Sequence, residues 1–221
     1  MEVRLLSHTP LDVAYISAKT CYSPDSPIEI SEDVISKDKM VSFLKKIIST
    51  GHLSTVEGIN FSFAIKDVSR SLLAQLTRHR VGIQFSVQSQ RYVKYDEIRY
   101  YTPPTIAKNK EALEIYELIM ADIENAYLKL NELGIPAEDS RYVLSNATYT
   151  NISTTINLRS LVHIMGLRLC ARASLEIRML MSEMRKAIIE VEPWLSEILL
   201  PQCEHLGYCP ERDCCGRKAK K

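Results

Sequence analysis

The chain has 221 residues, of which 46% are hydrophobic and 25% charged, with 28 Lys and Arg against 27 Asp and Glu for a formal net charge of +1. This balance argues against a protein that coats nucleic acid, and the lack of an apolar run of about 18 residues argues against a membrane-spanning segment. The length suits one large domain or two small ones and allows a hydrophobic core without disulfides.

The first 66 residues predict mixed secondary structure. An apolar strand is expected at 3–6 and a helix after Pro10, and Met40, Phe43, Leu44, Ile47 and Ile48 have the spacing of a second helix. Gly51 is expected to end that helix. Residues 59–66 alternate between apolar and polar, which predicts a half-buried strand.

The middle of the chain predicts a short helix at 69–76 and a strand within 83–93. If that strand runs to its end, Ser89, Arg91 and Val93 share one face and Gln88, Gln90 and Tyr92 the other. Residues 110–133 carry an apolar helical stripe, closed by Gly134 and Pro136.

The last third begins with a polar, Thr-rich stretch at 141–156 and continues as one long predicted helix from 157 to about 191, with its exit at Pro193. No repeat or linker divides the chain. We therefore expect one α+β domain over residues 1–200, followed by a cysteine- and lysine-rich tail at 201–221.

The six cysteines do not form an evenly spaced secreted framework, because Cys21 and Cys170 are isolated and four others lie in the tail. Since the N-terminus lacks the features of a signal peptide, we expect a cytoplasmic protein with reduced thiols. The tail cysteines suggest zinc, but the adjacent Cys214 and Cys215 are poorly placed to bind one ion, so a packed or mobile tail without metal is favoured.

Two segments rich in arginine contain no acidic residue. The first arginine window, residues 68–95, holds Arg70, Arg78, Arg80, Arg91 and Lys94, and the second, residues 140–175, holds Arg141, Arg159, Arg168 and Arg172. Because a guanidinium binds phosphate or carboxylate through two hydrogen bonds, the windows predict a small polyanionic ligand. Solvated surface arginines remain the alternative.

The first window also carries neutral polar side chains that suit a nucleobase or sugar: Gln75, Gln84, Ser86, Gln88, Ser89 and Gln90. This combination favours nucleotide recognition. The chain has no glycine-rich phosphate loop, so arginine side chains would have to bind the phosphates. No cysteine lies in the first window, and we do not expect a thiol nucleophile.

Arg78-His79-Arg80, followed by Ser89-Gln90-Arg91-Tyr92-Val93, resembles the signature of the flavin-dependent thymidylate synthases. Residues 51–57, 135–141 and 157–168 are similar to further motifs of that family in order and spacing. The resemblance implies an α+β single domain with a mixed antiparallel sheet and long helices, assembled as a homotetramer whose active sites are shared between subunits.

The resemblance also implies the reaction. Such enzymes make dTMP from dUMP by reductive methylation, with 5,10-methylenetetrahydrofolate as the carbon donor, FAD as the redox carrier and NADPH as the reductant, and with no cysteine nucleophile. No nucleic acid, membrane or metal is implied.

Carried over by position, the residues expected to bind FAD are Ser54, Arg78, His79, Arg80, Asn157, Arg159 and His163. Those expected to bind dUMP are Gln75, Arg78, Gln88, Ser89, Gln90, Arg91, Arg141 and Arg168. Arg168 is also the expected catalytic residue, because a cation beside the uracil would favour ionisation at N3.

One departure from the family concerns spacing, since eight residues separate Arg80 from Ser89 where the family pattern has seven. A bulge at Gly82 is expected to absorb the extra residue. Which of Gln84, Ser86 and Gln88 contacts the nucleotide stays open.

Two other hypotheses from different classes remain. A nucleic-acid-binding module would use both arginine windows on phosphates and would bind in a salt-sensitive way, although the near-neutral charge disfavours it. A metal protein built on the cysteine tail would contain zinc and would not depend on Arg78 or Arg168.

Overall fold

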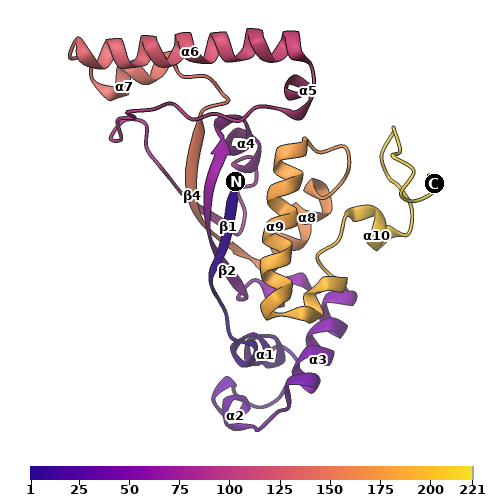
Figure 1. Cartoon of the computed structure of the whole chain (residues 1–221). Helices are drawn as coiled ribbons and strands as arrows, with labels where there is room; N and C mark the ends of the chain where they lie inside the picture. The colour runs from indigo at the N-terminus through magenta and orange to yellow at the C-terminus, as the bar shows by residue number, and fades with distance from the viewer. Residues whose placement is uncertain (221) are drawn as a thin grey trace. The chain divides into compact units, whose positions relative to one another are not determined.

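A computed structural model describes residues 1–220, which form two compact units. The first unit contains residues 1–2, 65–78 and 86–152, and the second contains residues 3–64, 79–85 and 153–220. Strands labelled in Figure 1 contribute residues to both units, so neither unit is one continuous stretch of chain.

The three elements predicted in the N-terminal part of the chain are confirmed. They are strand β1 (Glu2–His8), helix α1 (Leu11–Thr20) and helix α3 (Lys37–Ser49), with Gly51 in a left-handed conformation just beyond α3. Helix α2 (Pro27–Glu32) was not predicted. Its signal is a capping box in which the Ser26 hydroxyl accepts from Glu29 N–H and the Glu29 carboxylate accepts from Ser26 N–H.

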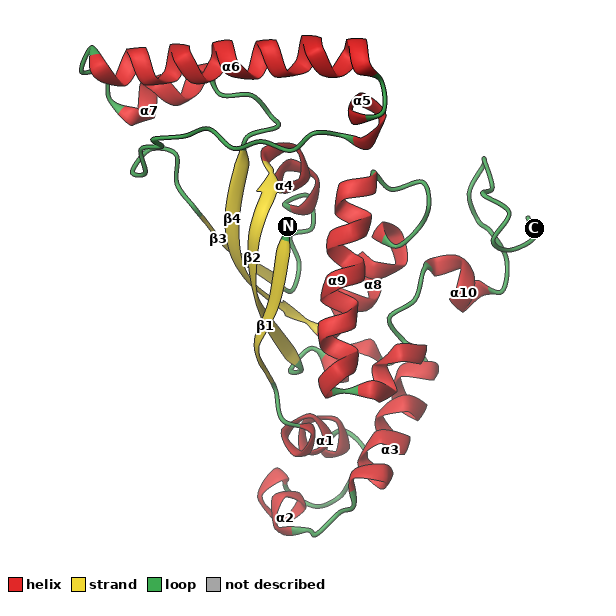
Figure 2. Ribbon diagram, viewed as in Figure 1, coloured by secondary structure: helices red, strands yellow, loops and turns green. Residues whose placement is uncertain are grey.

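Within residues 1–220 the strands form one antiparallel sheet in the order β1-β2-β4-β3, drawn in yellow in Figure 2. The predicted strand at 59–66 corresponds to β2 (Asn60–Ser69). Strand β4 (Tyr149–Asn157) lies in the Thr-rich stretch, where no strand was predicted. Its side chains alternate in burial, and the buried ones include two threonines, whose branched Cβ suits a strand.

The strand predicted within 83–93 is shorter than expected. Strand β3 (Ile83–Val87) ends before Gln88, and the chain turns at Ser89, whose carbonyl accepts from Val93 N–H and whose hydroxyl accepts from Arg91 N–H. The expected alternation of Ser89, Arg91 and Val93 on one strand face is therefore wrong, because a local turn takes their backbone hydrogen bonds.

The first unit contains the predicted helices α4 (Arg70–Leu76) and α6 (Lys110–Glu132), together with short helices α5 (Pro104–Ala107), α7 (Ala137–Ser140) and η2 (Arg141–Val143). Ser69 begins α4 by accepting from Leu72 N–H at 2.9 Å. The core of this unit includes Leu72, Leu76, Ile98, Met120 and Tyr127.

The second unit contains α8 (Leu158–Arg168) and α9 (Leu175–Val191), which pack against each other. The single helix predicted over 157–191 is wrong, because residues 169–174 turn the chain and Ser174 begins a new helix. Large buried side chains of this unit come from both the sheet and the helices: Leu44, Phe61, Phe63, Ile156, Leu158, Leu161, Ile164, Met165 and Ile177.

Beyond α9, a short helix η3 (Pro193–Glu197) begins at the predicted exit and α10 (Gln202–Leu206) follows. In the described part of the tail, Cys203 and Cys209 are buried, and Asp213 pairs with Arg172 at 2.9 Å. No helix formed by residues 1–220 is long and apolar enough to span a bilayer.

Candidate functional site

The segment after Arg78-His79-Arg80 is hydrogen-bonded to the start of α8 in the second unit. Asn157 N–H donates to Gly82 O at 2.9 Å, Ser160 Oγ donates to Val81 O at 2.7 Å, and the Asn157 side chain caps the helix by accepting from Ser160 N–H. Gly82 has φ +64°, and a Cβ there would lie 2.7 Å from Asn157 Cγ and closer still to Ser160 Oγ. Glycine is needed here both for its conformation and for this close approach.

Gly82 therefore does not form the bulge expected from the sequence. It lies just before β3 and allows the chain to pass directly over the start of α8.

Helix α8 carries three of the predicted site residues, and the side chains of two of them contact His79. The Arg168 guanidinium donates from Nε to His79 Nε2 at 3.0 Å, and the rings of His163 and His79 meet edge to face at 6.2 Å. A cationic donor on Nε2 requires the neutral His79 ring to carry its proton on Nδ1. His79 thus connects the first arginine window to the second.

Arg159, in the first turn of α8, forms an ion pair with Glu57, which follows the short helix η1 (Leu53–Val56) that carries Ser54. Helix α8 packs against η1. A cavity of about 250 Å³ lies beside this contact, lined among others by Leu53, His163 and His205. Four expected flavin residues therefore belong to neighbouring elements of the second unit: Ser54, Asn157, Arg159 and His163.

Arg78 and Arg80 are exposed, and among residues 1–220 neither forms an ion pair or a side-chain hydrogen bond. Each is a cation with its full hydrogen-bonding capacity available for a ligand. The two flank His79 in sequence, although Arg78 belongs to the first unit and Arg80 to the second.

In the first unit, Arg91 and Arg141 converge on one residue. Arg91 donates to the Glu138 carboxylate from Nε at 3.1 Å and Nη2 at 2.9 Å, and Arg141 donates from Nε to Glu138 O at 3.0 Å. Two arginines from separate sequence windows are thus placed together. Gln75, on α4, belongs to the same unit.

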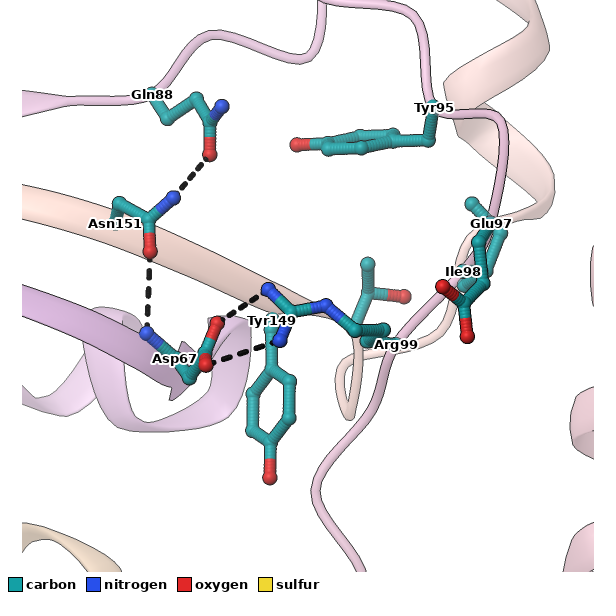
Figure 3. Close-up of a pocket in the computed structure, with 9 residues that line it drawn as sticks. Asp67, Gln88, Tyr95, Glu97, Ile98, Arg99, Tyr149 and Asn151 are labelled. Atoms are coloured by element: carbon teal, nitrogen blue, oxygen red, sulfur yellow. Dashed lines mark hydrogen bonds and ion pairs between the residues drawn. The ribbon is translucent and has the colours of Figure 1, made fainter. Parts of the chain in front are cut away.

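Gln88 and Gln90 lie in the loop that follows β3. Gln88 accepts from Asn151 Nδ2 at 2.7 Å and belongs to a small cavity drawn in Figure 3, whereas Gln90 is buried with an Nε2 that has no protein partner within residues 1–220. Gln84 and Ser86 lie on the exposed face of β3. Of the three side chains left open by the sequence, Gln88 lines this cavity.

The predicted residues divide by unit. Those assigned to FAD lie in the second unit except Arg78, namely Ser54, His79, Arg80, Asn157, Arg159 and His163. Those assigned to dUMP lie in the first unit except Arg168, namely Gln75, Arg78, Gln88, Ser89, Gln90, Arg91 and Arg141. The boundary falls inside the Arg-His-Arg triplet.

Although the arginine windows contain no acidic residue, three of their arginines pair with acids from elsewhere in the chain. Glu138 pairs with Arg91, Glu57 with Arg159, and Asp213 with Arg172, and each acid lies outside the window of its partner. Sequence distance hid these pairs because they join residues 41 to 102 positions apart.

Sequence reasoning assigned no role to Asp67, Arg99, Glu138 or Asn151. Asp67 is the one residue at positions 1–220, glycine aside, with a positive φ, at +58°, and Arg99 binds both oxygens of its carboxylate. A signal was present only for Asp67, since aspartate is among the residues that tolerate this conformation.

All six cysteines belong to the second unit. Cys170, which falls inside the second arginine window, lines a small cavity with Cys203, Cys209 and Cys215 in the second unit. Burial raises the pKa of the Cys203 thiol. Within residues 1–220 no group of three or more His, Cys, Asp or Glu side chains is arranged to hold a metal ion.

Comparison with known proteins shows which family this chain is similar to. The sequence model described as "Thymidylate synthase complementing protein" matches residues 4–194. A flavin-dependent thymidylate synthase of Nitratidesulfovibrio vulgaris is 40% identical over 97% of this chain and 94% of its own length. One from Geobacter sulfurreducens is 38% identical over 100% of this chain and 96% of its own length.

Among solved structures, the chain is similar to thymidylate synthase X from Helicobacter pylori with FAD and dUMP, with a TM-score of 0.72 and 26% identity over 90% of this chain and 99% of that one. It is also similar in fold to a UMP/dUMP methylase from Streptomyces cacaoi, with a TM-score of 0.76 and 18% identity over 90% of this chain and 96% of the other. The predicted α+β single-domain class is confirmed.

Proposed function

The chain belongs to the flavin-dependent thymidylate synthase family, and from that membership we propose that it makes dTMP from dUMP by reductive methylation. The carbon donor is 5,10-methylenetetrahydrofolate, and FAD reduced by NADPH is the redox carrier. The observation that carries the proposal is the hydrogen bond from Arg168 to His79, which brings the expected catalytic residue against the central histidine of the Arg-His-Arg motif.

The chemistry of the donor set fits FAD. Arg80 offers an exposed guanidinium without a protein partner within residues 1–220, which suits the pyrophosphate, and Arg78 can contribute in the same way. Ser54, His79, Asn157, Arg159 and His163 supply hydroxyl, imidazole, amide and guanidinium groups. Arg159 is already oriented by Glu57, so it can serve as a fixed donor.

When bound, FAD supplies the hydride chemistry that the amino acid side chains lack. The residues of this chain bind and orient FAD and dUMP, and they polarise the substrate. Gln75, Arg78, Gln88, Ser89, Gln90, Arg91 and Arg141 bind dUMP, with Ser89 and Arg91 near its phosphate.

Arg168 touches the uracil and stabilises the negative charge that develops when N3 ionises and C5 becomes nucleophilic. Its bond to His79 limits the motion of the guanidinium, so the cation is placed before the substrate arrives. No cysteine attacks the pyrimidine; the nearest cysteine in sequence, Cys170, lines the cavity of the tail.

The proposed assembly is a homotetramer with active sites shared between subunits. Helix α6 supports it, because Ile115, Leu118 and Ile119 expose 60%, 63% and 49% of their surface. Such side chains on a long helix suit contact with another copy. Leu118→Glu should lower the mass measured by sedimentation velocity, whereas unchanged assembly would exclude α6 from the interface.

We also propose a cytoplasmic location and the division into a catalytic domain at 1–200 and a tail at 201–221. The family match ends at residue 194, close to the proposed boundary. Truncation after residue 200 should leave the flavin-binding residues in the chain, and FAD titration of the truncated protein tests the division.

The first experiment is the visible absorption spectrum of the purified protein with added FAD, before and after anaerobic NADPH and dUMP. Retained flavin bands that bleach and return with oxygen support the flavoenzyme, and formation of dTMP with 5,10-methylenetetrahydrofolate then tests the reaction. Failure to retain flavin at any useful FAD concentration would contradict the proposal and favour salt-dependent nucleic-acid binding instead.

A further inference from the structure

Asp67 holds an uncommon backbone conformation in the first unit. Its φ is +58°, a conformation that L-residues rarely adopt, and both oxygens of its carboxylate accept from Arg99, at 3.0 and 2.6 Å. The Arg99 guanidinium also lies over the Tyr149 ring, 6.0 Å from its centroid. The Asp67 N–H is thereby fixed in direction, and it donates to Asn151 Oδ1 at 3.1 Å.

This single N–H determines the orientation of two side-chain amides. Because a backbone N–H can only donate, Asn151 must direct its oxygen to Asp67 and its NH₂ toward Gln88. The Asn151 NH₂ in turn requires an acceptor, so Gln88 directs Oε1 to it, at 2.7 Å. The Gln88 NH₂ is the end of this series, and Figure 3 shows it directed away from Asn151.

Beside Gln88 is a cavity of about 40 Å³, with room for roughly two or three water-sized groups. Two hydroxyls that line it, Tyr95 Oη and Thr148 Oγ1, have no protein partner within residues 1–220, and Thr148 is only 2% exposed. In Figure 3 the Tyr95 hydroxyl is directed across the space toward the Gln88 side of the cavity. Unpartnered buried polar atoms of this kind indicate that a polar group completes the site.

We propose that Asn151 is a positioning residue that fixes the Gln88 amide as a hydrogen-bond donor. Because the donor must meet an acceptor, the nucleotide has to present an oxygen that accepts a hydrogen bond at this position. The inference rests on the proposed function, because it deepens the assignment of Gln88 to dUMP. The acceptor is a carbonyl oxygen of the base or an oxygen of the phosphate, which offer the same chemistry to an NH₂ group.

Asn151→Asp tests the relay. The new carboxylate still accepts from Asp67 N–H, but its second oxygen cannot donate, so Gln88 turns its NH₂ toward that oxygen and presents Oε1 to the cavity. We expect the Kd for dUMP, measured by calorimetry on the FAD-loaded protein, to rise at least tenfold while the Kd for FAD changes less than twofold. Asn125→Asp, the same substitution at an exposed position of α6, should change neither.

A double-mutant cycle separates positioning from general disturbance. In a Gln88→Ala background, Asn151→Asp should have little further effect on dUMP affinity. An equal effect in both backgrounds, or a change below twofold in the single variant, would overturn the proposal. Gln88→Glu keeps the bond from Asn151 and replaces the NH₂ by an oxygen, so it should weaken dUMP as well, and it provides the test if Asn151→Asp does not fold.

Deoxyuridine identifies the acceptor. If Asn151→Asp weakens deoxyuridine as much as dUMP, the acceptor belongs to the nucleoside, and if only dUMP is weakened, it belongs to the phosphate. Absence of dUMP binding to the wild-type protein would refute the proposed function and this inference together. Normal wild-type binding with unaffected variants would refute the inference alone.

Discussion

The guanidinium of Arg168 donates to His79 Nε2 across 3.0 Å, which joins the last residue of α8 to the centre of the Arg-His-Arg triplet. The two residues are 89 positions apart in the sequence. Arg168 is therefore oriented by a neutral imidazole rather than by a carboxylate, so its positive charge is not compensated by this contact.

Arg168→Ala should remove most turnover and leave FAD bound, because its proposed partner is the uracil. Loss of a charged donor aimed at developing negative charge costs about 10²–10³-fold in kcat. Steady-state assays of dTMP formation, together with flavin absorbance, measure both effects. Arg168→Lys is the matched variant, and it should recover only part of the activity because lysine lacks the Nε–H that reaches His79. Wild-type turnover in the alanine variant would exclude the catalytic assignment.

Arg78 and Arg80 allow a paired comparison, since both are exposed but only Arg78 is assigned to both ligands. Arg78→Ala should weaken FAD and dUMP, whereas Arg80→Ala should weaken FAD and leave dUMP unchanged. Loss of one charge-assisted contact corresponds to about 1.5–3 kcal/mol, or roughly 10- to 150-fold in Kd. Titrations of each variant with each ligand decide the matter. Equal behaviour of the two variants would contradict the shared role of Arg78.

Gly82→Ala should destabilise the protein by about 2–4 kcal/mol, from a strained φ, from overlap with Asn157 and Ser160, and from loss of the α8 cap. Gly134→Ala is the control, because Gly134 has φ +82° but a Cβ added there would meet no atom within 4 Å. It should cost only about 1 kcal/mol. Urea unfolding of both variants measures the difference, and similar losses would show that the close approach at Gly82 is unimportant.

Tyr95→Phe should make the protein less sensitive to alkaline pH. Burial raises the pKa of Tyr95 above its usual value of about 10, and Tyr127 also raises it while Arg70 lowers it. The folded phenol holds its proton more tightly than the unfolded one, so this stability is fully present below pH 10 and is lost as the pH rises through the folded pKa. Phenylalanine has no such proton.

At pH 7 the free energy of unfolding of the same variant should lie within about 0.5 kcal/mol of the wild-type value, because the Tyr95 hydroxyl makes no hydrogen bond to the described residues. Urea titrations at pH 7 and pH 10.5 test both expectations. If the wild type and the variant lose stability equally between these pH values, Tyr95 is not the titrating group.

Local patterns predicted much of the fold. The stripe at 110–133 became α6, and the alternation at 59–66 became β2, because each has a period that matches its structure. Strand β4 was missed because its buried face includes Thr150 and Thr154, which periodicity reads as polar. The prediction of one long helix at 157–191 was wrong for the opposite reason, since the apolar spacing continues across a turn that depends on local hydrogen bonds.

The sequence predicted the site residues that belong to a motif. It did not predict the residues that contact them from distant parts of the chain. The sequence indicated Arg91 and Arg141, but not that Glu138 joins them. It indicated Gln88, but not the orientation of its amide, which depends on a backbone N–H at Asp67. Tertiary contacts of this kind leave no periodic or compositional pattern.

The sheet order has a consequence for how the chain folds. Strand β4, the last to be synthesised, lies between β2 and β3, so these earlier strands cannot complete their hydrogen-bonded ladders until residue 157 has left the ribosome. Pairing strands so distant in sequence closes long loops, which slows folding relative to a protein built from local contacts. A nascent chain that stops before β4 exposes the edges of β2 and β3, and it is therefore a candidate for capture by chaperones or for aggregation.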